Sequence, residues 1–386
     1  MQFKRYDLAI INLSFWPKNQ IIGDALLQLG EKASDKGKCV VVITQYVGDL
    51  KKIADKFGRG SGLLFRSCKS RSDSSTKLLF RIVDAVIYML WVFWSLLATR
   101  PKKIYVSTDP PLIVPFVVFI YSKIFKASYV YHLQDIHPEA ANIAVKLNPV
   151  LFSFLRKIDG LVMRHASGII TITQTMKHEI ISRSKTKSRI SLVDNPTVVT
   201  CDFAKDKIKG FVFSGNAGRV QRIPLLLKSI REYKNQGGTL PFLFIGAGVH
   251  SNAIRLLSKE YDDVTYEGLV GADIANELTA KYEWALLPIE DEVTRYAFPS
   301  KTSSYALCGT NILSICSDWT PVAKWVVSHN YGINTSPDID NIVKAFFKIE
   351  SGVAIDPRKV DADYFSIERF AENIYGVIYG KVDGVI

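Results

Sequence analysis

The sequence predicts an α/β protein of two domains, each built on a parallel sheet with helices on both faces. Its 386 residues exceed what one hydrophobic core usually supports. Short apolar runs alternate with amphipathic stretches, a pattern typical of successive βαβ units. The alternation stops at a polar segment, residues 194–210, and then begins again. These three observations indicate two doubly wound domains that face each other across a cleft.

Strands and helices alternate through the first half of the chain. Residues 22–36 are predicted as a helix, and a second helix ends near Ala166. The runs predicted as buried strands are 6–13, 39–44, 103–107, 129–133 and 168–173. Continuous apolar runs of this length indicate strands that are covered on both faces.

The second half repeats the pattern. Its predicted strands are 211–214, 240–245, 264–267 and 284–287, and its predicted helices are 223–236, 251–261 and 272–281. Before them, the segment 194–210 contains Asn195, Pro196 and five charged residues between positions 202 and 209. This composition predicts an interdomain linker.

Charge is distributed unevenly. Residues 1–200 contain 29 Lys and Arg against 14 Asp and Glu, whereas residues 201–386 contain 20 against 23. The net charge of +12 therefore comes from the first half, which indicates an anionic surface partner on that side. The sequence shows no helix-turn-helix, RNP-type or zinc spacing, so nucleic acid is not expected as a partner.

An anionic membrane fits the basic half better, because this half is also rich in apolar residues. Residues 85–98 form a 14-residue uncharged run, and Arg100, Lys102 and Lys103 follow it. The run is too short to span a bilayer comfortably. A helix that lies in the membrane interface and a buried core helix both remain open. A second run, residues 112–125, ends at Lys123 and Lys126.

The cysteines and the N-terminus predict a location. Five cysteines are scattered without a CxxC pair, and residues 1–15 are predicted to form a strand instead of a signal peptide. We therefore expect a cytoplasmic protein that binds peripherally to the inner face of the cell membrane.

Two loops of the second domain predict an anion site. Residues 298–309 (FPSKTSSYALCG) follow a buried strand, offer a hydroxyl and a cation at Ser300 and Lys301, and then begin a helix. A helix N-terminus has unpaired N–H groups and a partial positive charge, which suits a diphosphate. Residues 214–222 (SGNAGRVQR) add two glycines and the donors of Arg219, Gln221 and Arg222. An ordinary strand-to-helix turn remains the alternative for each loop.

The first domain has polar residues after a predicted strand, in residues 131–139 (YHLQDIHPE). We expect His132 and Asp135 to point into the cleft, with a structural hydrogen-bonded pair as the alternative. The spacing does not fit a helical metal pair. Two Asp-x-Asp matches, at 338/340 and 361/363, lie in late polar segments, so no metal site is expected.

These motifs together resemble GT-B glycosyltransferases of family 4, within the bacterial surface-polysaccharide subgroup that includes colanic-acid and N-acetylfucosamine transferases. The matching segments are residues 107–112 (STDPPL), 131–139, 214–221 and 298–309. The resemblance implies a GT-B fold with a domain 1–196 for the acceptor, a domain 197–364 for the donor, and residues 365–386 crossing back to the first domain.

The resemblance also implies an activity. It would be a retaining, metal-independent hexosyl or N-acetylhexosaminyl transferase without a cofactor, using a UDP- or GDP-linked sugar. The acceptor would be an oligosaccharide or a polyprenyl-diphosphate-linked saccharide in O-antigen, capsule or exopolysaccharide synthesis. The residues implied for catalysis are His132, Asp135, Arg219 and Lys301. Those implied for donor binding are Gly23, Gly215, Asn216, Arg219, Gln221, Gly246, Gly248, Pro299, Ser300, Lys301, Thr302 and Ser304.

One departure from the family leaves two other functions open. Many members have a Glu-x7-Glu element, and this chain has Tyr296 and Ser304 at the two glutamate positions. A non-catalytic GT-B subunit that binds a glycan or a nucleotide is therefore an alternative. A sugar-nucleotide epimerase on the same fold is a further one.

Overall fold

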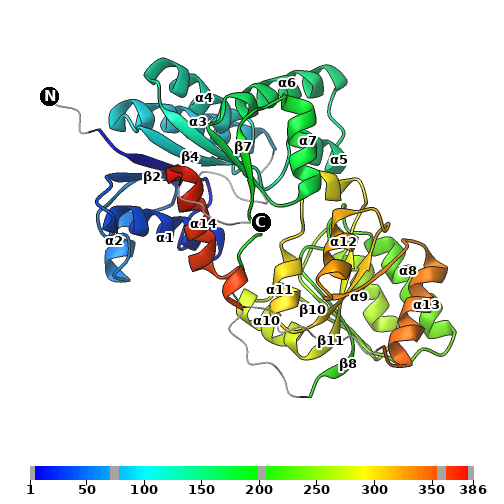
Figure 1. Cartoon of the computed structure of the whole chain (residues 1–386). Helices are drawn as coiled ribbons and strands as arrows, with labels where there is room; N and C mark the ends of the chain where they lie inside the picture. The colour runs from blue at the N-terminus through cyan, green and yellow to red at the C-terminus, as the bar shows by residue number, and fades with distance from the viewer. Residues whose placement is uncertain (1–4, 70–77, 199–205, 354–361, 381–386) are drawn as a thin grey trace. The chain divides into compact units, whose positions relative to one another are not determined.

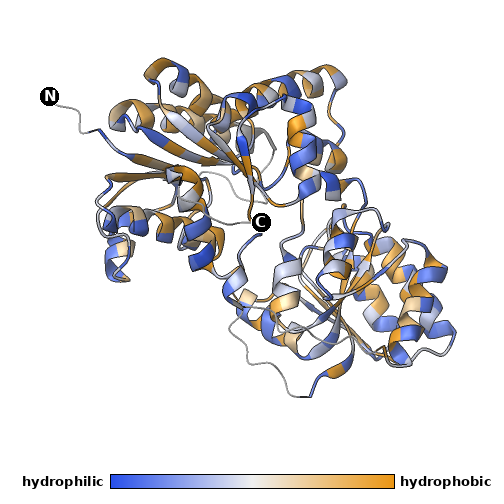
Figure 2. Cartoon of the chain, in the orientation of Figure 1, coloured by the Kyte–Doolittle hydropathy of each residue, from blue (hydrophilic) through white to orange (hydrophobic). Residues whose placement is uncertain are grey.

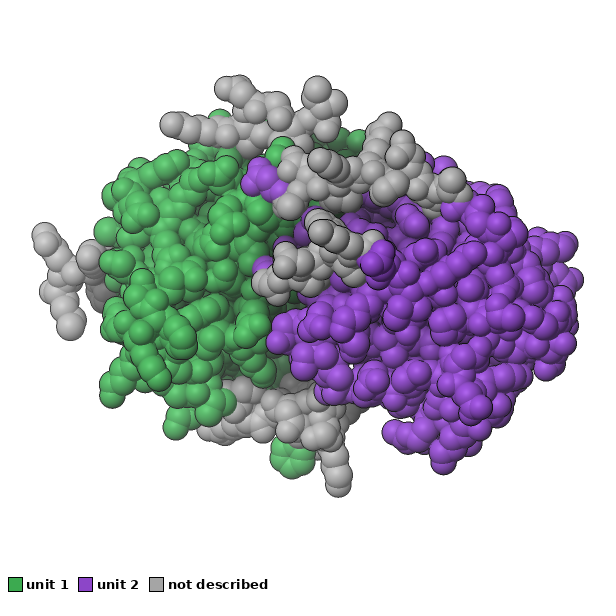
Figure 3. Space-filling model, turned by 90° about the horizontal axis from the view of Figure 1, so that it is seen from below, with its two compact units in different colours: residues 1–196, 365–386 green, residues 197–364 purple. Residues whose placement is uncertain are grey.

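The fold is seen in a computed structural model, which describes residues 5–69, 78–198, 206–353 and 362–380. The chain divides into two compact units, which have different colours in Figure 3. Unit 1 comprises residues 1–196 and 365–386, and unit 2 comprises residues 197–364. Each unit has its own parallel sheet between layers of helices (Figure 1), so the predicted fold class is confirmed.

Unit 1 contains a seven-stranded sheet in the order β3-β2-β1-β4-β5-β6-β7. Its strands are β1 (Leu8–Ile11), β2 (Val40–Gln45), β3 (Leu63–Cys68), β4 (Lys103–Ser107), β5 (Ser128–His132), β6 (Gly168–Thr171) and β7 (Arg189–Leu192). All the pairs are parallel, with β1 between β2 and β4. The strand order therefore reverses between β1 and β4.

Two layers of helices cover this sheet. One layer contains α1 (Ile22–Asp35) and α14 (Ile367–Tyr379), and the other contains α3 (Leu78–Thr99), α4 (Ile113–Phe125) and α6 (Pro149–His165), as Figure 1 shows. Three shorter helices complete the unit: α2 (Leu50–Lys56), α5 (Glu139–Ala144) and α7 (Gln174–Ser184). Phe370 and Ile374 of α14 share one core with Leu26 of α1 and Ile10 of β1, so the C-terminal helix is part of unit 1.

Unit 2 contains a six-stranded parallel sheet in the order β10-β9-β8-β11-β12-β13. Its strands are β8 (Ile208–Ser214), β9 (Phe242–Ile245), β10 (Val264–Gly268), β11 (Tyr282–Pro288), β12 (Asn311–Ile315) and β13 (Gly332–Thr335). Its α-helices are α8 (Ile223–Asn235), α9 (Ser251–Glu260), α10 (Ala272–Ala280), α11 (Lys301–Leu307), α12 (Pro321–Ser328) and α13 (Ile339–Glu350). Two 3₁₀ turns, η1 (Val293–Arg295) and η2 (Ala362–Phe365), are also present.

Aromatic residues fill the core of unit 2. Phe211, Phe242, Phe346 and Tyr233 pack in mutual ring contact between the sheet and helices α8 and α13. Figure 2 shows that the strands of both sheets are mainly hydrophobic. This agrees with the continuous apolar runs by which the sequence predicts them.

The two apolar runs of the first half form helices. Residues 85–98 lie within α3, and residues 112–125 correspond to α4. None of the described helices is both long and apolar enough to cross a membrane. The described cysteines Cys39, Cys68, Cys308 and Cys316 form no disulfide bond with one another.

Candidate functional site

The carboxyl ends of the strands in unit 2 bring most of the predicted donor-site residues together. Its strand order reverses between β8 and β11, and ligands of open parallel sheets bind outside the strand ends at such a point. The loop after β8, residues 215–222, and the loop after β11, residues 289–300, leave the sheet there. Both loops belong to the motifs that predict an anion site.

Lys301 is the most unusual side chain at this edge. Its ammonium nitrogen is buried without a hydrogen-bond partner among the described residues, although the residue as a whole is partly exposed. The nitrogen lies 4.2 Å from the ring centroid of Phe213, and a Cβ placed on Gly215 would come within 3.1 Å of it. Burial lowers the pKa of Lys301 to about 7. An ammonium held without a counter-charge is suited to bind an anion.

α11 is fastened to the sheet next to this lysine. The hydroxyl of Tyr305 accepts a hydrogen bond from the Ser214 amide and donates one to the Ser214 carbonyl, each 2.9 Å long. Lys207 donates to the carbonyls of Cys308 and Gly309 at the other end of the helix. The first residue of α11, Lys301, is therefore held against the end of β8.

The predicted polar residues of the 298–309 segment make mostly local bonds. The Thr302 hydroxyl donates to the Pro299 carbonyl at 2.7 Å, and the Ser304 hydroxyl lies 2.9 Å from that of Thr197. Ser300 is the N-cap of α11, but its side chain makes no capping bond. Thr302 and Ser304 thus have structural partners, whereas the Lys301 ammonium has no hydrogen-bond partner in the part of the chain that the structure describes.

The predicted glycines let two loops lie in backbone contact. Gly215 and Gly246 have φ of 128° and 113°, a region that favours glycine. A Cβ on Gly246 would lie 2.1 Å from the Gly215 carbonyl oxygen, and one on Gly248 would lie 2.3 Å from that of Ala217. These glycines therefore have a packing reason, apart from any contact with a nucleotide.

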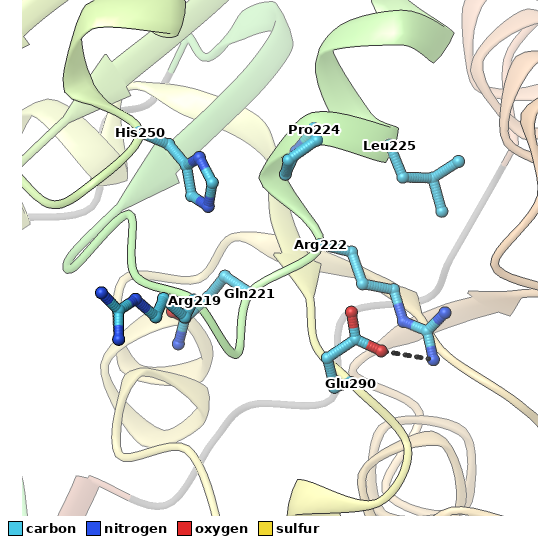
Figure 4. Close-up of a pocket in the computed structure, with 7 residues that line it drawn as sticks. All are labelled: Arg219, Gln221, Arg222, Pro224, Leu225, His250 and Glu290. Carbon is cyan, nitrogen blue, oxygen red and sulfur yellow. Dashed lines mark ion pairs between the residues drawn. The ribbon is translucent and has the colours of Figure 1, made fainter. Parts of the chain in front are cut away.

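A pocket of about 420 Å³ lies beside these loops. Figure 4 shows Arg219 and Gln221 from the loop after β8, His250 from the start of α9, and Glu290 from the loop after β11. Arg219 is exposed and makes no ion pair with a described residue, whereas the side-chain Oε1 of Gln221 accepts from the Gly218 amide at 3.1 Å. The volume falls within the range of small-molecule sites.

Asp291 joins three loops at this edge. Its carboxylate pairs with Arg222, which lines the pocket, at 3.0 Å. It also accepts bonds from the amide and hydroxyl of Ser317, at 2.9 and 2.7 Å. The loops after β8, β11 and β12 are therefore connected through one side chain.

His132 of unit 1 is not where the sequence predicts it. The ring is fully buried, its Nδ1 lies 2.6 Å from the Tyr105 hydroxyl, and the Phe370 ring lies beside it. Its Nε2 has no partner, and burial lowers its pKa to about 3. The expectation that this imidazole points into a cleft is wrong, because the side chain fills the core between β4, β5 and α14.

Asp135, by contrast, is only partly buried and forms no hydrogen bond or ion pair with a described residue. Burial raises its pKa to about 6. Gly23 has a packing role, because a Cβ there would lie 2.5 Å from the Trp16 amide nitrogen. The loop after β1 lies directly on α1 as a result.

Among the described residues, no cluster of His, Cys, Asp and Glu could hold a metal ion. Asp338 is the N-cap of α13 and accepts a bond from the Asn341 amide. Asp361, of the second Asp-x-Asp match, lies outside the described residues.

The sequence did not identify several residues of this edge. The segment 298–309 contains Tyr305 but does not single it out, and Asp291 and His250 lie in no motif, since each of the three acts through a tertiary contact or through its position at a loop. Asp291 lies three residues after the end of β11, and this position after a strand is the signal that would have pointed to it.

No protein-family model matches the chain. The probable glycosyltransferase WbjE of Pseudomonas aeruginosa is 24% identical over 322 residues, which cover 74% of this chain and 78% of that protein. Among solved structures, WaaG, a glycosyltransferase involved in lipopolysaccharide biosynthesis, has a TM-score of 0.62 at 12% identity, covering 97% of this chain and 100% of that one. HepE of Anabaena in complex with UDP has a TM-score of 0.59 at 14% identity, covering 97% and 95%.

The chain therefore has the GT-B fold of two parallel-sheet α/β units, and it is similar in sequence to a probable glycosyltransferase. A putative UDP-N-acetylglucosamine 2-epimerase from Listeria monocytogenes also matches, with a TM-score of 0.59 at 11% identity over 98% of each chain. The fold alone does not decide the reaction. The side chains at the sheet edge must decide it.

Proposed function

We propose that this protein is a glycosyltransferase that moves a sugar from a nucleotide-sugar donor to a saccharide acceptor in polysaccharide synthesis. The observation that supports this most directly is the unpartnered ammonium of Lys301 at the switch point of the unit 2 sheet. An ammonium next to a glycine backbone offers a diphosphate both a charge and room to approach. The similarity to WbjE and WaaG supports the same class of reaction.

In this proposal, Lys301 and Arg219 stabilise the leaving group. Breaking a sugar–phosphate bond develops negative charge on the nucleoside diphosphate. Lys301 turns its ammonium toward the diphosphate on its flexible stem, while the exposed Arg219 reaches it from the loop after β8. These two cations then stabilise the negative charge that a metal ion stabilises in other transferases, so the reaction is metal-independent.

The remaining details follow from the family resemblance. The donor is a UDP- or GDP-linked hexose or N-acetylhexosamine, and the anomeric configuration is retained. Asp135 of unit 1 accepts a hydrogen bond from a hydroxyl of the transferred sugar. The pathway is that of an O-antigen, capsule or exopolysaccharide, and no cofactor is required.

Calorimetry tests the donor site. UDP, GDP and ADP are titrated, without metal, into wild type, Lys301→Ala and the control Lys259→Ala, which changes an exposed lysine of α9. We expect one nucleotide to bind, Lys301→Ala to weaken it, and Lys259→Ala to have no effect. Turnover by Lys301→Ala should fall by one to several orders of magnitude, since a leaving-group contact contributes about 2 to 4 kcal/mol. Near wild-type turnover would refute the role of Lys301.

A non-catalytic subunit is the second candidate, and one observation favours it. Ser304 stands at a position where many family members have a carboxylate, and its hydroxyl is bonded to Thr197 instead. Such a subunit would bind a nucleotide or a glycan but release no nucleotide from any donor. Purified protein is incubated with sugar nucleotides and a membrane extract, and the released nucleotide is measured. Release identifies a transferase, and no release identifies a non-catalytic subunit.

We also propose that unit 1 docks on an anionic membrane surface through α3, α4 and α6. α3 has a stripe of exposed apolar side chains, which includes Phe80, Leu90 and Trp94 with exposed fractions of 62%, 57% and 63%. Their spacing places them on one face of the helix. The partly exposed apolar residues continue onto the neighbouring α4 and α6, for example at Ile124 and Phe154.

Charge on these helices supports the same partner. Their two acidic residues, Asp84 and Asp159, are buried, so the three helices expose no described carboxylate. Lys123, Lys157 and Arg164 are exposed on α4 and α6. A surface with apolar side chains and cations only is complementary to anionic lipid.

Flotation with liposomes tests this surface. We expect binding to vesicles with phosphatidylglycerol, weaker binding at high salt, and none to phosphatidylcholine alone. Trp94→Glu should abolish binding, whereas Leu256→Glu, on an exposed apolar residue of α9 in unit 2, should not. Vesicle binding that does not change with salt, or equal vesicle binding by Trp94→Glu and Leu256→Glu, would contradict the proposal.

A further inference from the structure

The turn between β12 and α12 exposes a tryptophan at the same edge of the unit 2 sheet as Lys301. The side chain of Trp319 is 54% exposed, while Cys316 and Thr320 around it are fully buried. Trp319 forms no ring contact or hydrogen bond with a described residue. An exposed indole offers an apolar ring face and an N–H group to a ligand.

Hydrogen bonds hold the turn on both sides of Trp319. Before it, the amide and hydroxyl of Ser317 bind Asp291, and the Asn334 amide group donates to Asp318 at 2.6 Å. After it, Thr320 caps α12 by accepting from the Ala323 amide at 3.1 Å. The backbone that presents the indole is therefore fixed, and the ring is not part of a loosely packed loop.

The same contacts connect Trp319 with the candidate site. Asp291, which holds Ser317, also pairs with Arg222 of the pocket. Ser317, two residues before Trp319, is therefore bonded to the same carboxylate that pairs with Arg222 in the wall of the pocket. The loops after β8, β11 and β12 form one connected edge.

We propose that Trp319 is a stacking platform for a pyranose ring, and this rests on the proposed function. The C–H face of a pyranose is apolar and matches an indole face, while its hydroxyls need polar partners at the rim. Asp318, the residue before the indole, accepts one bond from Asn334 and keeps further acceptor sites on its carboxylate. One aromatic ring next to a carboxylate in a turn fits a sugar better than it fits a bilayer, for which α3 offers a stripe of several apolar residues.

The sugar comes either from the donor or from the acceptor, and kinetics separate the two. Trp319→Ala is compared with Trp319→Phe and with Val327→Ala, a nearby exposed residue of α12. If the donor sugar stacks there, Trp319→Ala raises the KM for the sugar nucleotide about tenfold without changing the affinity for the free nucleoside diphosphate. If the acceptor stacks there, the KM for the acceptor rises and donor hydrolysis is unchanged.

In both cases Trp319→Phe keeps most of the activity, because it keeps an aromatic face, and Val327→Ala matches wild type. Unchanged KM values for both substrates in Trp319→Ala would overturn the proposal. A second measurement does not depend on turnover. Saturation-transfer NMR with the methyl glycosides of glucose, galactose, mannose and N-acetylglucosamine should show at least one signal that Trp319→Ala removes.

The NMR result also keeps this proposal distinct from the proposed function. A protein that binds no nucleotide but shows a Trp319-dependent sugar signal would refute the transferase and keep the platform. A protein that binds a nucleotide through Lys301 but shows neither the NMR signal nor a KM change in Trp319→Ala would keep the transferase and refute the platform. A Trp319-dependent change in oligomeric state by light scattering, without a sugar effect, would assign the indole to protein contact and overturn the platform.

Discussion

Lys301 should make nucleotide binding depend on pH in the neutral to alkaline range. Burial lowers its pKa to about 7, from an ordinary value of 10.5. The side chain is therefore charged below pH 7 and becomes neutral above it. A bound diphosphate favours the charged form, so binding above pH 7 must take up a proton.

The size of the effect follows from the fraction of protein with a charged lysine. With a pKa near 7, this fraction is about one half at pH 7 and about 1% at pH 9. If only the charged form binds, the apparent dissociation constant is divided by that fraction, so it rises about fiftyfold between the two pH values. Phosphate groups lose their last proton near pH 6 and contribute little over this range.

Calorimetry from pH 6 to 9 in buffers of different ionisation enthalpy measures both the affinity and the proton uptake. Lys301→Arg is the matched variant, because a guanidinium stays charged throughout this range. We expect wild type to lose affinity as pH rises and Lys301→Arg to bind with a flat profile. A flat wild-type profile, or no proton uptake at pH 8, would refute the argument that an unpaired, buried lysine binds the diphosphate.

Two further predictions concern stability. Gly246→Ala should lower the free energy of unfolding by about 3 kcal/mol, because the alanine would have a positive φ and its Cβ would lie 2.1 Å from the Gly215 carbonyl oxygen. Gly237→Ala should lower it by only about 1 kcal/mol, because φ is 90° there but no atom lies near the added Cβ. Equal losses in urea unfolding would contradict the close approach of the two loops. Tyr105→Phe should cost about 1 to 3 kcal/mol, because it removes the hydroxyl that the buried His132 contacts. An unchanged unfolding midpoint would mean that water replaces this bond.

The fold could be predicted largely because buried parallel strands are continuous apolar runs. Residues 103–107 and 223–236 correspond closely to β4 and α8. β3, β7, β12 and β13 were not predicted; β12 is apolar and lies between β11 and β13, so its run was a recognisable signal. β7 (Arg189–Leu192) is short, polar and at an edge of the sheet, and β3 contains Arg66, so neither has a continuous apolar signal. Edge strands are recognised by their pairing with a neighbour, which one sequence does not contain.

The candidate site could be predicted only as far as its loops. A glycine or a lysine after a strand marks the loop, but the direction of a side chain depends on what packs against it. His132 and Asp135 illustrate this, since His132 ends β5 and Asp135 follows it closely, yet His132 lies in the core beside Phe370. Phe370 is more than 200 residues away in the sequence. No local pattern could have shown that contact.

The contacts around α11 show what holds this helix at position 304, where the family resemblance expects a carboxylate. A glutamate there would place a second charge near the first turn of a helix that already displays an unpaired ammonium. In this chain the hydroxyl of Ser304 bonds to that of Thr197, and the Tyr305 hydroxyl bonds to the end of β8, so these two positions of the helix are held by neutral groups. Among the described residues, the ammonium of Lys301 has no hydrogen-bond partner. In the proposed function, the diphosphate of the donor supplies the counter-charge for this ammonium.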